Sequence, residues 1–320
     1  MNERILACTH AGDGALGALR MANALAERDG SPVDVLAVVP TVFMEGLTLY
    51  AFPTGLVPED AASVERFRQE VRAQLAGVGG AVARVEPRVE IGQVSHTIAG
   101  FAQSGAAGLI LLGAGRHDVA TRLVGGETSL YVSRMARVPV LAVPADAERI
   151  PRSAVAAVDF SEYSRDAART AARLMGPGGV LHLVHATWFA HAEMRAGGDW
   201  LADYLAGARG RLHELADVLQ RETGVEVHTE IDIGDPVPSL LQRVRDAGAE
   251  LLAAGSHGHG FFTRMLLGST STRLLRGAGC AVLIAPPRAA WAVPRQQPVE
   301  TRAQRPDPVW DPALQPASAT

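Results

Sequence analysis

Residues 251–271 read LLAAGSHGHGFFTRMLLGSTS, and residues 109–129, which lie 142 positions earlier, read LILLGAGRHDVATRLVGGETS. Each stretch begins with a short apolar run and continues through a loop to glycine and small polar residues. Identical residues recur at the same offset, without a gap, from Ile91-Gly92 (matched by Ile233-Gly234) to Pro144 (matched by Pro286). A constant offset over so long a stretch indicates that the chain contains a duplicated unit.

The second copy alternates between strand-like and helix-like periodicities. The expected strands cover residues 154–159, 180–186, 225–233, 251–255 and 281–285. The expected helices cover 161–175, with Ser161 as the N-cap, 200–219, 237–244 and a segment after Gly268. Strands that alternate with helices in this way predict a parallel, doubly wound α/β sheet with right-handed crossovers. We therefore expect two tandem doubly wound domains, each with a five-stranded parallel sheet of Rossmann-like type.

The expected domain boundaries follow from the repeat. We expect a first domain over residues 1–147 and a second over residues 148–288. Residues 289–320 hold six prolines among polar and scattered apolar residues, and such a segment buries too little surface to fold, so we expect a disordered tail.

The first strands of the two copies also align, but at a different offset. Leu6 to Thr9 can be matched to Ala156 to Asp159, but only at an offset of 150. The first copy would then hold about eight extra residues, which we assign to residues 41–60. This stretch contains Pro53, Pro58 and glycines, and it is expected to be a loop.

The loop after residue 255 has the composition of a phosphate-binding site. It reads Gly255-Ser256-His257-Gly258-His259-Gly260, and Gly268-Ser269-Thr270-Ser271 then opens a helix. In doubly wound sheets, ligands bind beyond the carboxyl ends of the strands, where the strand order reverses. Glycines let the backbone approach an anion, and a helix N-terminus offers free N–H groups and a positive dipole end. The simpler alternative is an ordinary glycine loop followed by a capped helix.

The spacing of these residues resembles a known family. Gly255-x2-Gly258-x9-Gly268-Ser269 is similar to the G-x2-G-x9-G-[ST] motif of ATP-binding universal stress proteins, and Val158-Asp159-Phe160-Ser161 is similar to that family's V-D-x-S. Gly234-Asp235-Pro236 and the strand that ends at Pro286 add to the likeness. The motif lies within residues 153–287, and residues 3–145 resemble the family at the level of the fold. The resemblance therefore implies two domains of the universal stress protein type.

The resemblance also implies a ligand and the residues that hold it. The ligand would be ATP or another adenine nucleotide, accompanied by Mg²⁺ held mainly by the phosphates. Asp159 would recognise the adenosine end, although a carboxylate at a strand end could instead cap the next helix. The other implied contacts are Ala254, Gly255 and Gly258 along the ribose and phosphates, and Gly268, Ser269 and Thr270 at the β- and γ-phosphates. His257 is expected near the phosphates, and Arg264 either neutralises phosphate charge or is solvated.

The first copy departs from this pattern. At the offsets given above, Thr9 replaces Asp159, Arg116 replaces Gly258 and Glu127 replaces Ser269. A carboxylate at the helix N-terminus would occupy and repel the place of a phosphate, so we expect no ATP site in this half. The family resemblance implies instead that its last strand pairs with that of the second copy, 138–143 against 281–285, to form an intramolecular pseudo-dimer.

Bulk properties exclude several classes of function. The net charge of −4 gives no basic field for nucleic acid or anionic membranes, and no apolar run approaches the roughly 20 residues of a bilayer span. The beginning of the chain lacks the features of a signal peptide, and only two cysteines occur, Cys8 and Cys280. We therefore expect a cytoplasmic protein. Since residues three apart on a strand point to opposite faces, His182 and His185 are not expected to share a metal ion, and no P-loop lysine follows the glycine loop.

Three functions remain open at the level of sequence. The first is an ATP-binding stress-response regulator, in which the nucleotide acts as a switch. The second is a slow ATPase or adenylate-handling enzyme, for which His257 is a modest candidate base and no other catalytic residue is evident. The third is a nucleotide-free interaction scaffold. A homo-oligomer and an unidentified protein partner are compatible with all three.

Overall fold

The computed structural model describes residues 3–44, 47–52, 55–58, 60–114, 128–187, 200–257 and 267–287. Gly258 and Arg264 of the expected site lie outside these ranges. So do Arg116 and Glu127 of the first copy and the expected tail from Ala289.

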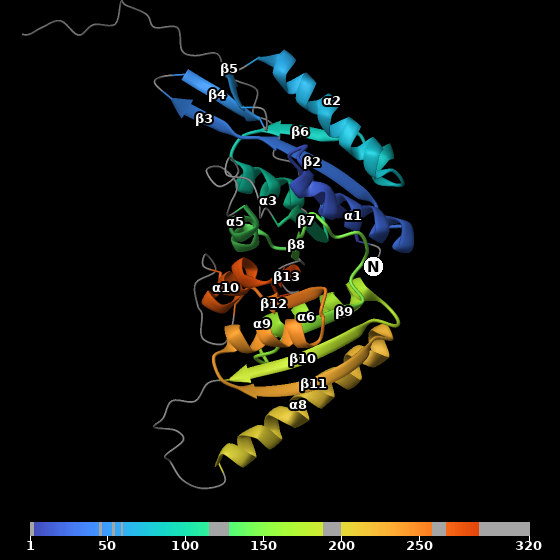
Figure 1. Cartoon of the computed structure of the whole chain (residues 1–320), viewed down its shortest axis with the longest axis vertical. Helices are drawn as coiled ribbons and strands as arrows, with labels where there is room; N and C mark the ends of the chain where they lie inside the picture. Colours follow the sequence, from blue (N-terminus) through green and yellow to red (C-terminus); the bar gives the residue numbers. More distant parts are fainter. Residues whose placement is uncertain are drawn as a thin grey trace, which may run out of the picture.

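A ten-stranded sheet runs through the whole molecule (Figure 1). In spatial order, its strands are β11 (Glu226–Ile233), β10 (Val180–Thr187), β9 (Ser153–Ala157), β12 (Leu251–Gly255), β13 (Ala281–Ala285), β8 (Val140–Val143), β7 (Leu109–Gly113), β1 (Ile5–Thr9), β2 (Val33–Val39) and β6 (Arg88–Ile91). The first five belong to the second copy and the last five to the first copy. Within each half all neighbouring strands are parallel, as predicted, and the strand order is that of a doubly wound fold.

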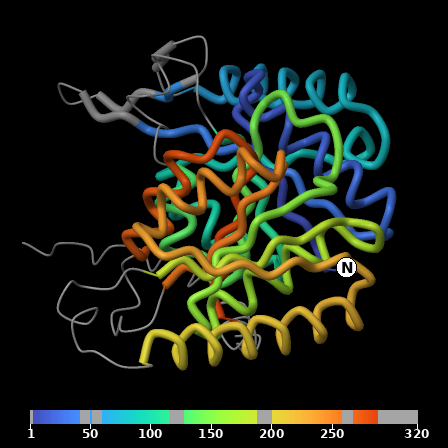
Figure 2. Tube along the Cα trace, turned by 60° about the horizontal axis from the view of Figure 1, so that its bottom comes forward, coloured from blue at the N-terminus to red at the C-terminus, as the bar shows by residue number. Residues whose placement is uncertain are grey.

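Helices cover both faces of this sheet. One face carries α1 (Leu16–Asp29), α2 (Ala61–Val78), α6 (Glu162–Met175) and α8 (Trp200–Thr223), whose apolar residues join one core with both halves of the sheet. The other face carries α3 (Val94–Ser104), α5 (Thr128–Met135), α9 (Pro236–Asp246) and α10 (Ser269–Gly277), over two smaller cores. Figure 2 shows α2 and α8 at opposite ends of the molecule, as the repeat requires.

The two halves join through their last strands. β13 pairs with β8 in the antiparallel direction, with Leu283 opposite Leu141, so the predicted pairing inside one chain is confirmed. A second junction lies between helices, where the guanidinium of Arg28 on α1 donates to the carbonyl oxygens of Leu174 (2.7 Å) and Met175 (3.1 Å) at the end of α6. A cation that donates to the last carbonyls of a helix stabilises that helix end. The first domain thus caps a helix of the second.

Strand register corrects the alignment of the first strands. Ile5 pairs with Leu109 on β7, and Ala154 pairs with Leu251 on β12. Because Leu109 and Leu251 are equivalent, Ile5 and Ala154 are equivalent too, at an offset of 149 rather than 150. The prediction that Thr9 stands in the place of Asp159 is therefore wrong, and His10 stands there. A strand buried on both faces reads as a continuous apolar run, so its sequence does not fix the alignment to one residue.

The insertion in the first copy is also different from the prediction. The stretch expected to be a loop contains β3 (Thr41–Met44), β4 (Leu47–Phe52) and β5 (Gly55–Pro58), which form a three-stranded antiparallel sheet. Gly55 and Pro58, taken as loop signals, stand at the two ends of β5. Glycine and proline therefore mark the ends of a short strand here and do not indicate a loop. The β-branched and aromatic residues of this stretch favour strands.

Candidate functional site

A pocket of about 360 Å³ opens at the carboxyl ends of β9 and β12, where the strand order reverses. Its described lining consists of Ala157, Val158, Asp159, Ser164, Val184, Ala186, Pro236, Leu240, Ala254, Gly255, His257, Gly268, Ser269, Thr270 and Ser271. All the expected site residues within the described ranges therefore line one pocket. Part of this lining is apolar, and its polar side chains come from the Asp159 turn and the start of α6, from His257, and from the start of α10.

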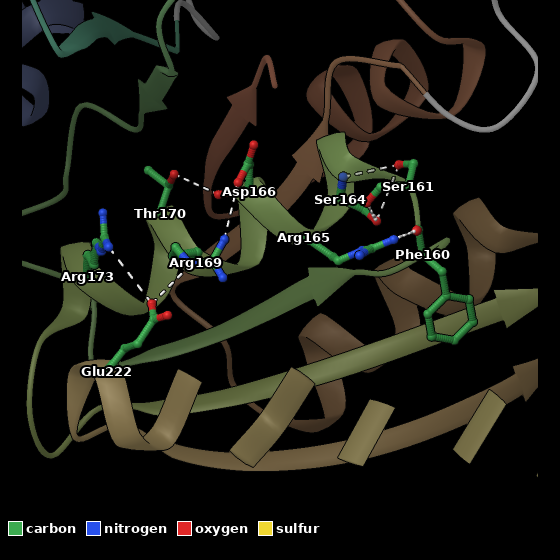
Figure 3. A network of polar contacts seen from close by, with 9 residues as sticks. All are labelled: Phe160, Ser161, Ser164, Arg165, Asp166, Arg169, Thr170, Arg173 and Glu222. Atoms are coloured by element: carbon green, nitrogen blue, oxygen red, sulfur yellow. Dashed lines mark hydrogen bonds and ion pairs between the residues drawn. The ribbon is translucent and has the colours of Figure 1, made fainter. Parts of the chain in front are cut away.

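Asp159 lies in a tight turn between β9 and α6. Its Oδ1 accepts from the backbone N–H of Ser161 (3.0 Å) and from the Ser161 hydroxyl (2.5 Å). Ser161 is the N-cap of α6, and its Oγ accepts from the N–H of Ser164, as predicted (Figure 3). Asp159 thus supports the helix entrance and also contributes to the pocket wall, so both of its expected roles are compatible with the geometry.

Gly255 has a packing reason of its own. A Cβ built on this residue would lie 2.6 Å from Cβ of Tyr163 and 2.9 Å from the backbone N of Ser164. The equivalent Gly113 is equally crowded, because a Cβ there would lie 2.2 Å from the carbonyl oxygen of Gly14. Both glycines let a helix begin close against the adjacent strand. Their recurrence therefore does not by itself indicate a ligand.

Gly268 differs from Gly255 in this respect. A Cβ on Gly268 would meet nothing among the described residues closer than 3.5 Å, and its φ of −54° and ψ of 146° suit any residue. Gly268 is the N-cap of α10, and having no side chain it leaves the first turn without a side-chain cap. Nothing in the described packing therefore requires glycine here.

The first turn of α10 presents backbone N–H groups to the pocket. The first hydrogen bond of the helix is donated by Thr272 to the carbonyl of Gly268 (3.0 Å), so the preceding N–H groups have no partner inside the helix. Ser269 is exposed, Thr270 is half-buried, and the Ser271 hydroxyl donates to the carbonyl of Gly255 (2.6 Å). This bond ties the helix start to the end of β12. The arrangement suits an anion, because N–H groups and the positive end of the helix dipole converge.

His257 stands at the edge of the pocket. Its Nδ1 lies 3.0 Å from the Ser256 hydroxyl, and its ring lies 5.2 Å from that of Tyr163. Its Nε2 is buried without a hydrogen-bond partner among the described residues. A buried polar atom usually has a partner, so this nitrogen is a candidate contact for a ligand or for the loop that follows.

His185 lies on β10, three residues after His182. The structure confirms that it and His182 lie on opposite faces, because His185 contacts Tyr204 of α8 whereas His182 stacks on His228 of β11. His185 Nδ1 lies 2.7 Å from the carbonyl oxygen of Val158, directly before Asp159. Burial lowers the pKa of His185, so the ring is neutral at pH 7. Sequence periodicity placed this residue on a strand but gave no signal of its contact with the turn.

The equivalent turn of the first domain is built differently. Gln74 of α2 accepts from the Thr9 hydroxyl (2.6 Å) and donates to the carbonyl of Gly12 (2.9 Å). His10 replaces the carboxylate of Asp159. In the described part of the chain, the first domain thus lacks the acidic group of the pocket in the second.

Two features are absent from the described part of the chain. Among the described residues, no group of three histidine, cysteine or acidic side chains is arranged to hold a metal ion. Within the same ranges, no helix combines the length and the apolar character that crossing a bilayer requires.

Comparisons with known proteins agree with the repeat. The sequence profile of the Universal stress protein family matches residues 1–144 and again residues 152–286. A universal stress protein of Mycolicibacterium smegmatis is 27% identical over 232 residues, which cover 71% of this chain and 76% of that protein. One of Mycobacterium tuberculosis is 31% identical over 188 residues, covering 57% of this chain and 63% of the relative.

A solved structure shows the same fold over nearly the whole chain. The crystal structure of a universal stress protein from Archaeoglobus fulgidus superposes with a TM-score of 0.62 and 21% identity. The match covers 90% of this chain and 97% of the other.

Proposed function

Since the chain belongs to the universal stress protein family, we propose that its second domain binds an adenine nucleotide, ATP in the first instance, in the pocket between β9 and β12. One observation carries the proposal: a single pocket joins a fixed carboxylate, Asp159, to the helix start of α10, which has no side-chain cap. The apolar residues of the same lining suit a base and a ribose. The phosphates would lie against Gly268, Ser269 and Thr270, and the adenosine end against Asp159.

The described lining also fits the cation expected with the phosphates. Asp159 is its only acidic side chain. A Mg²⁺ ion usually keeps several waters and is held by phosphate oxygens with one or two carboxylates, so a protein cage is not needed. No lysine or arginine appears in the described lining. The backbone N–H groups of α10 would therefore carry much of the phosphate recognition, together with Gly258 and Arg264 beyond the described ranges.

We further propose that the nucleotide regulates rather than reacts. Asp159 is engaged by Ser161, and His257 is the only other titratable group in the described lining apart from hydroxyls. Such a set favours a bound effector over a rapid hydrolase. The first domain would not bind ATP, because it carries His10 for Asp159, and would complete the pseudo-dimer. We place the boundary between the two domains at residues 147 and 148, between β8 and β9. We also propose that the protein acts in the cytoplasm, where free thiols such as those of Cys8 and Cys280 persist.

The test is the nucleotide content of the purified protein, with two variants that differ only in charge. Ser269 is exposed at the first position of α10, so Ser269→Gln and Ser269→Glu should both fold. Glutamate suits a helix N-terminus but repels a phosphate there. We expect about one adenine nucleotide per wild-type chain, or binding of added ATP with Mg²⁺, retained largely by the glutamine variant and lost by the glutamate variant. An empty wild-type protein that also fails to bind ATP would refute the proposal and leave an interaction scaffold.

A further inference from the structure

A buried polar network lies directly behind the Asp159 turn. His185 is 6% exposed, and its two ring nitrogens contact the carbonyl oxygen of Val158 (2.7 Å) and the hydroxyl of Tyr204 (2.8 Å). A carbonyl can only accept, so Nδ1 carries the proton, and Nε2 of the neutral ring accepts from the tyrosine. The imidazole therefore connects the end of β9 to the first turns of α8.

The same ring holds the residue that follows Asp159. Phe160 has a φ of +65°, a conformation that bulky side chains rarely adopt. Its ring lies 4.6 Å from that of His185, and the guanidinium of Arg211 lies 3.9 Å from its centroid. Arg165 donates twice to the Phe160 carbonyl, at 2.6 and 3.2 Å (Figure 3). Side chains from β10, α6 and α8 thus converge on one strained residue.

The first domain shows that the turn does not need this network in order to form. Ala11, equivalent to Phe160, has a φ of +61°, so the backbone conformation is repeated. Ala37 stands in the register position of His185, because Thr9 pairs with Ala37 as Val158 would with His185. The first domain, which has no counterpart of the Asp159 carboxylate, therefore also has no counterpart of the His185 imidazole. The network is therefore an addition in the domain that carries Asp159.

We infer that His185 is a positioning residue for the proposed nucleotide site. By holding the Val158 carbonyl and the Phe160 ring, it fixes the peptide on both sides of Asp159 and so aims the carboxylate into the pocket. This inference rests on the proposed function. It also makes α8, through Tyr204, part of the support of the site.

Three substitutions of His185 separate its contacts. Asparagine carries an amide nitrogen at the place of Nδ1 and can keep the bond to Val158. Glutamine reaches the place of Nε2 and can keep the bond to Tyr204, and leucine keeps neither. His182→Leu is the matched control, since His182 lies on the same strand but contacts Glu230 and His228 of β11. The measurements are the Kd for ATP with Mg²⁺ by calorimetry, thermal unfolding, and the hydrogen exchange of the Ser161 amide, which donates to Asp159.

We expect His185→Leu and His185→Gln to weaken ATP binding at least tenfold and to speed Ser161 exchange. His185→Asn should stay within about threefold of the wild type even if it is less stable, and His182→Leu should bind normally. Equal binding by all three His185 variants, or losses that follow only their unfolding temperatures, would overturn the inference and leave the proposed function standing. A wild-type protein that binds no adenine nucleotide would refute both, and this is seen before any variant is made.

Discussion

The two glycines of the pocket give opposite predictions for the same substitution. In Gly255→Ala, the new Cβ would lie 2.6 Å from Cβ of Tyr163, 2.8 Å from its carbonyl carbon and 2.9 Å from the nitrogen of Ser164. Ordinary contacts between carbon atoms need about 3.5–4.0 Å, so the start of α6 would have to move by about 1 Å. Overpacking of this kind costs about 1–3 kcal/mol, or a fall of roughly 2–4 °C in Tm for each kcal/mol.

In Gly268→Ala, two small effects oppose each other. Alanine is a poorer N-cap than glycine by about 0.5–1 kcal/mol, but it reduces the entropy of the unfolded chain by about 0.4–1 kcal/mol. Its Cβ would be no closer than 3.5 Å to any described atom, so no clash is added. We expect an unchanged Tm, within about 2 °C, and at least tenfold weaker ATP binding, because the methyl group occupies space that a phosphate needs.

The assay is thermal unfolding of both variants without ligand, followed by calorimetric titration with ATP and Mg²⁺. We expect Gly255→Ala to be less stable than the wild type, and Gly268→Ala to be as stable as the wild type but to bind ATP poorly. If Gly268→Ala binds ATP as the wild type does, no phosphate lies against this backbone. If Gly255→Ala is as stable as the wild type, the close approach of α6 to β12 does not constrain residue 255.

Three further predictions concern the frame of the site. Arg28→Met should lower the stability of the second domain by about 1 kcal/mol through loss of the α6 cap, without a direct effect on the ATP contacts; calorimetric unfolding would contradict this if Tm were unchanged. Leu141→Ala, at a residue with 0% exposure opposite Leu283, should cost about 2–5 kcal/mol, and limited proteolysis should then cut between the domains; resistance equal to the wild type would argue against a shared core. Burial lowers the pKa of His185; Arg211 adds to this shift, whereas the hydrogen bond to Val158 and the charge of Asp159 oppose it. As the pH falls, His185 is therefore protonated in the unfolded chain before it is protonated in the folded one, so its contribution to stability should be complete above about pH 6.5 and be lost below it. Tm measured against pH should show this fall, and the fall should be less steep in His185→Asn.

Most of the fold could be predicted from the repeat. The constant offset identified two equivalent domains, and alternating periodicities gave all five strands of the second domain close to their observed bounds. The predicted helix start at Ser161 was confirmed because an N-cap serine is a local signal. What failed was non-local: the alignment of β1 depends on its neighbours in the sheet, and β3–β5 depend on pairing between short segments.

The site was predictable as a set but not in its causes. The motif spacing predicted that one site contains Asp159, Gly255, Gly268 and Ser269, and all four line one pocket in the structure. Spacing could not separate Gly255, which is required by packing, from Gly268, which is not. It could not reveal His185 either, since a histidine in a buried strand looks the same whether it supports a turn or merely fills space.

The contact of Arg28 with the end of α6 has a consequence for how such a protein can change. In a symmetric dimer of identical chains, each contact across the axis occurs twice, so one residue must serve on both sides at once. Here the guanidinium is supplied from one side only, because the offset of 149 that aligns β1 with β9, and the buried face of α1 with that of α6, places Pro177 at the position of Arg28, beyond the end of α6. Covalent linkage of the two copies has removed the demand for self-complementarity. A mutation in the first domain can therefore affect the second domain while the sequence of the second domain stays unchanged.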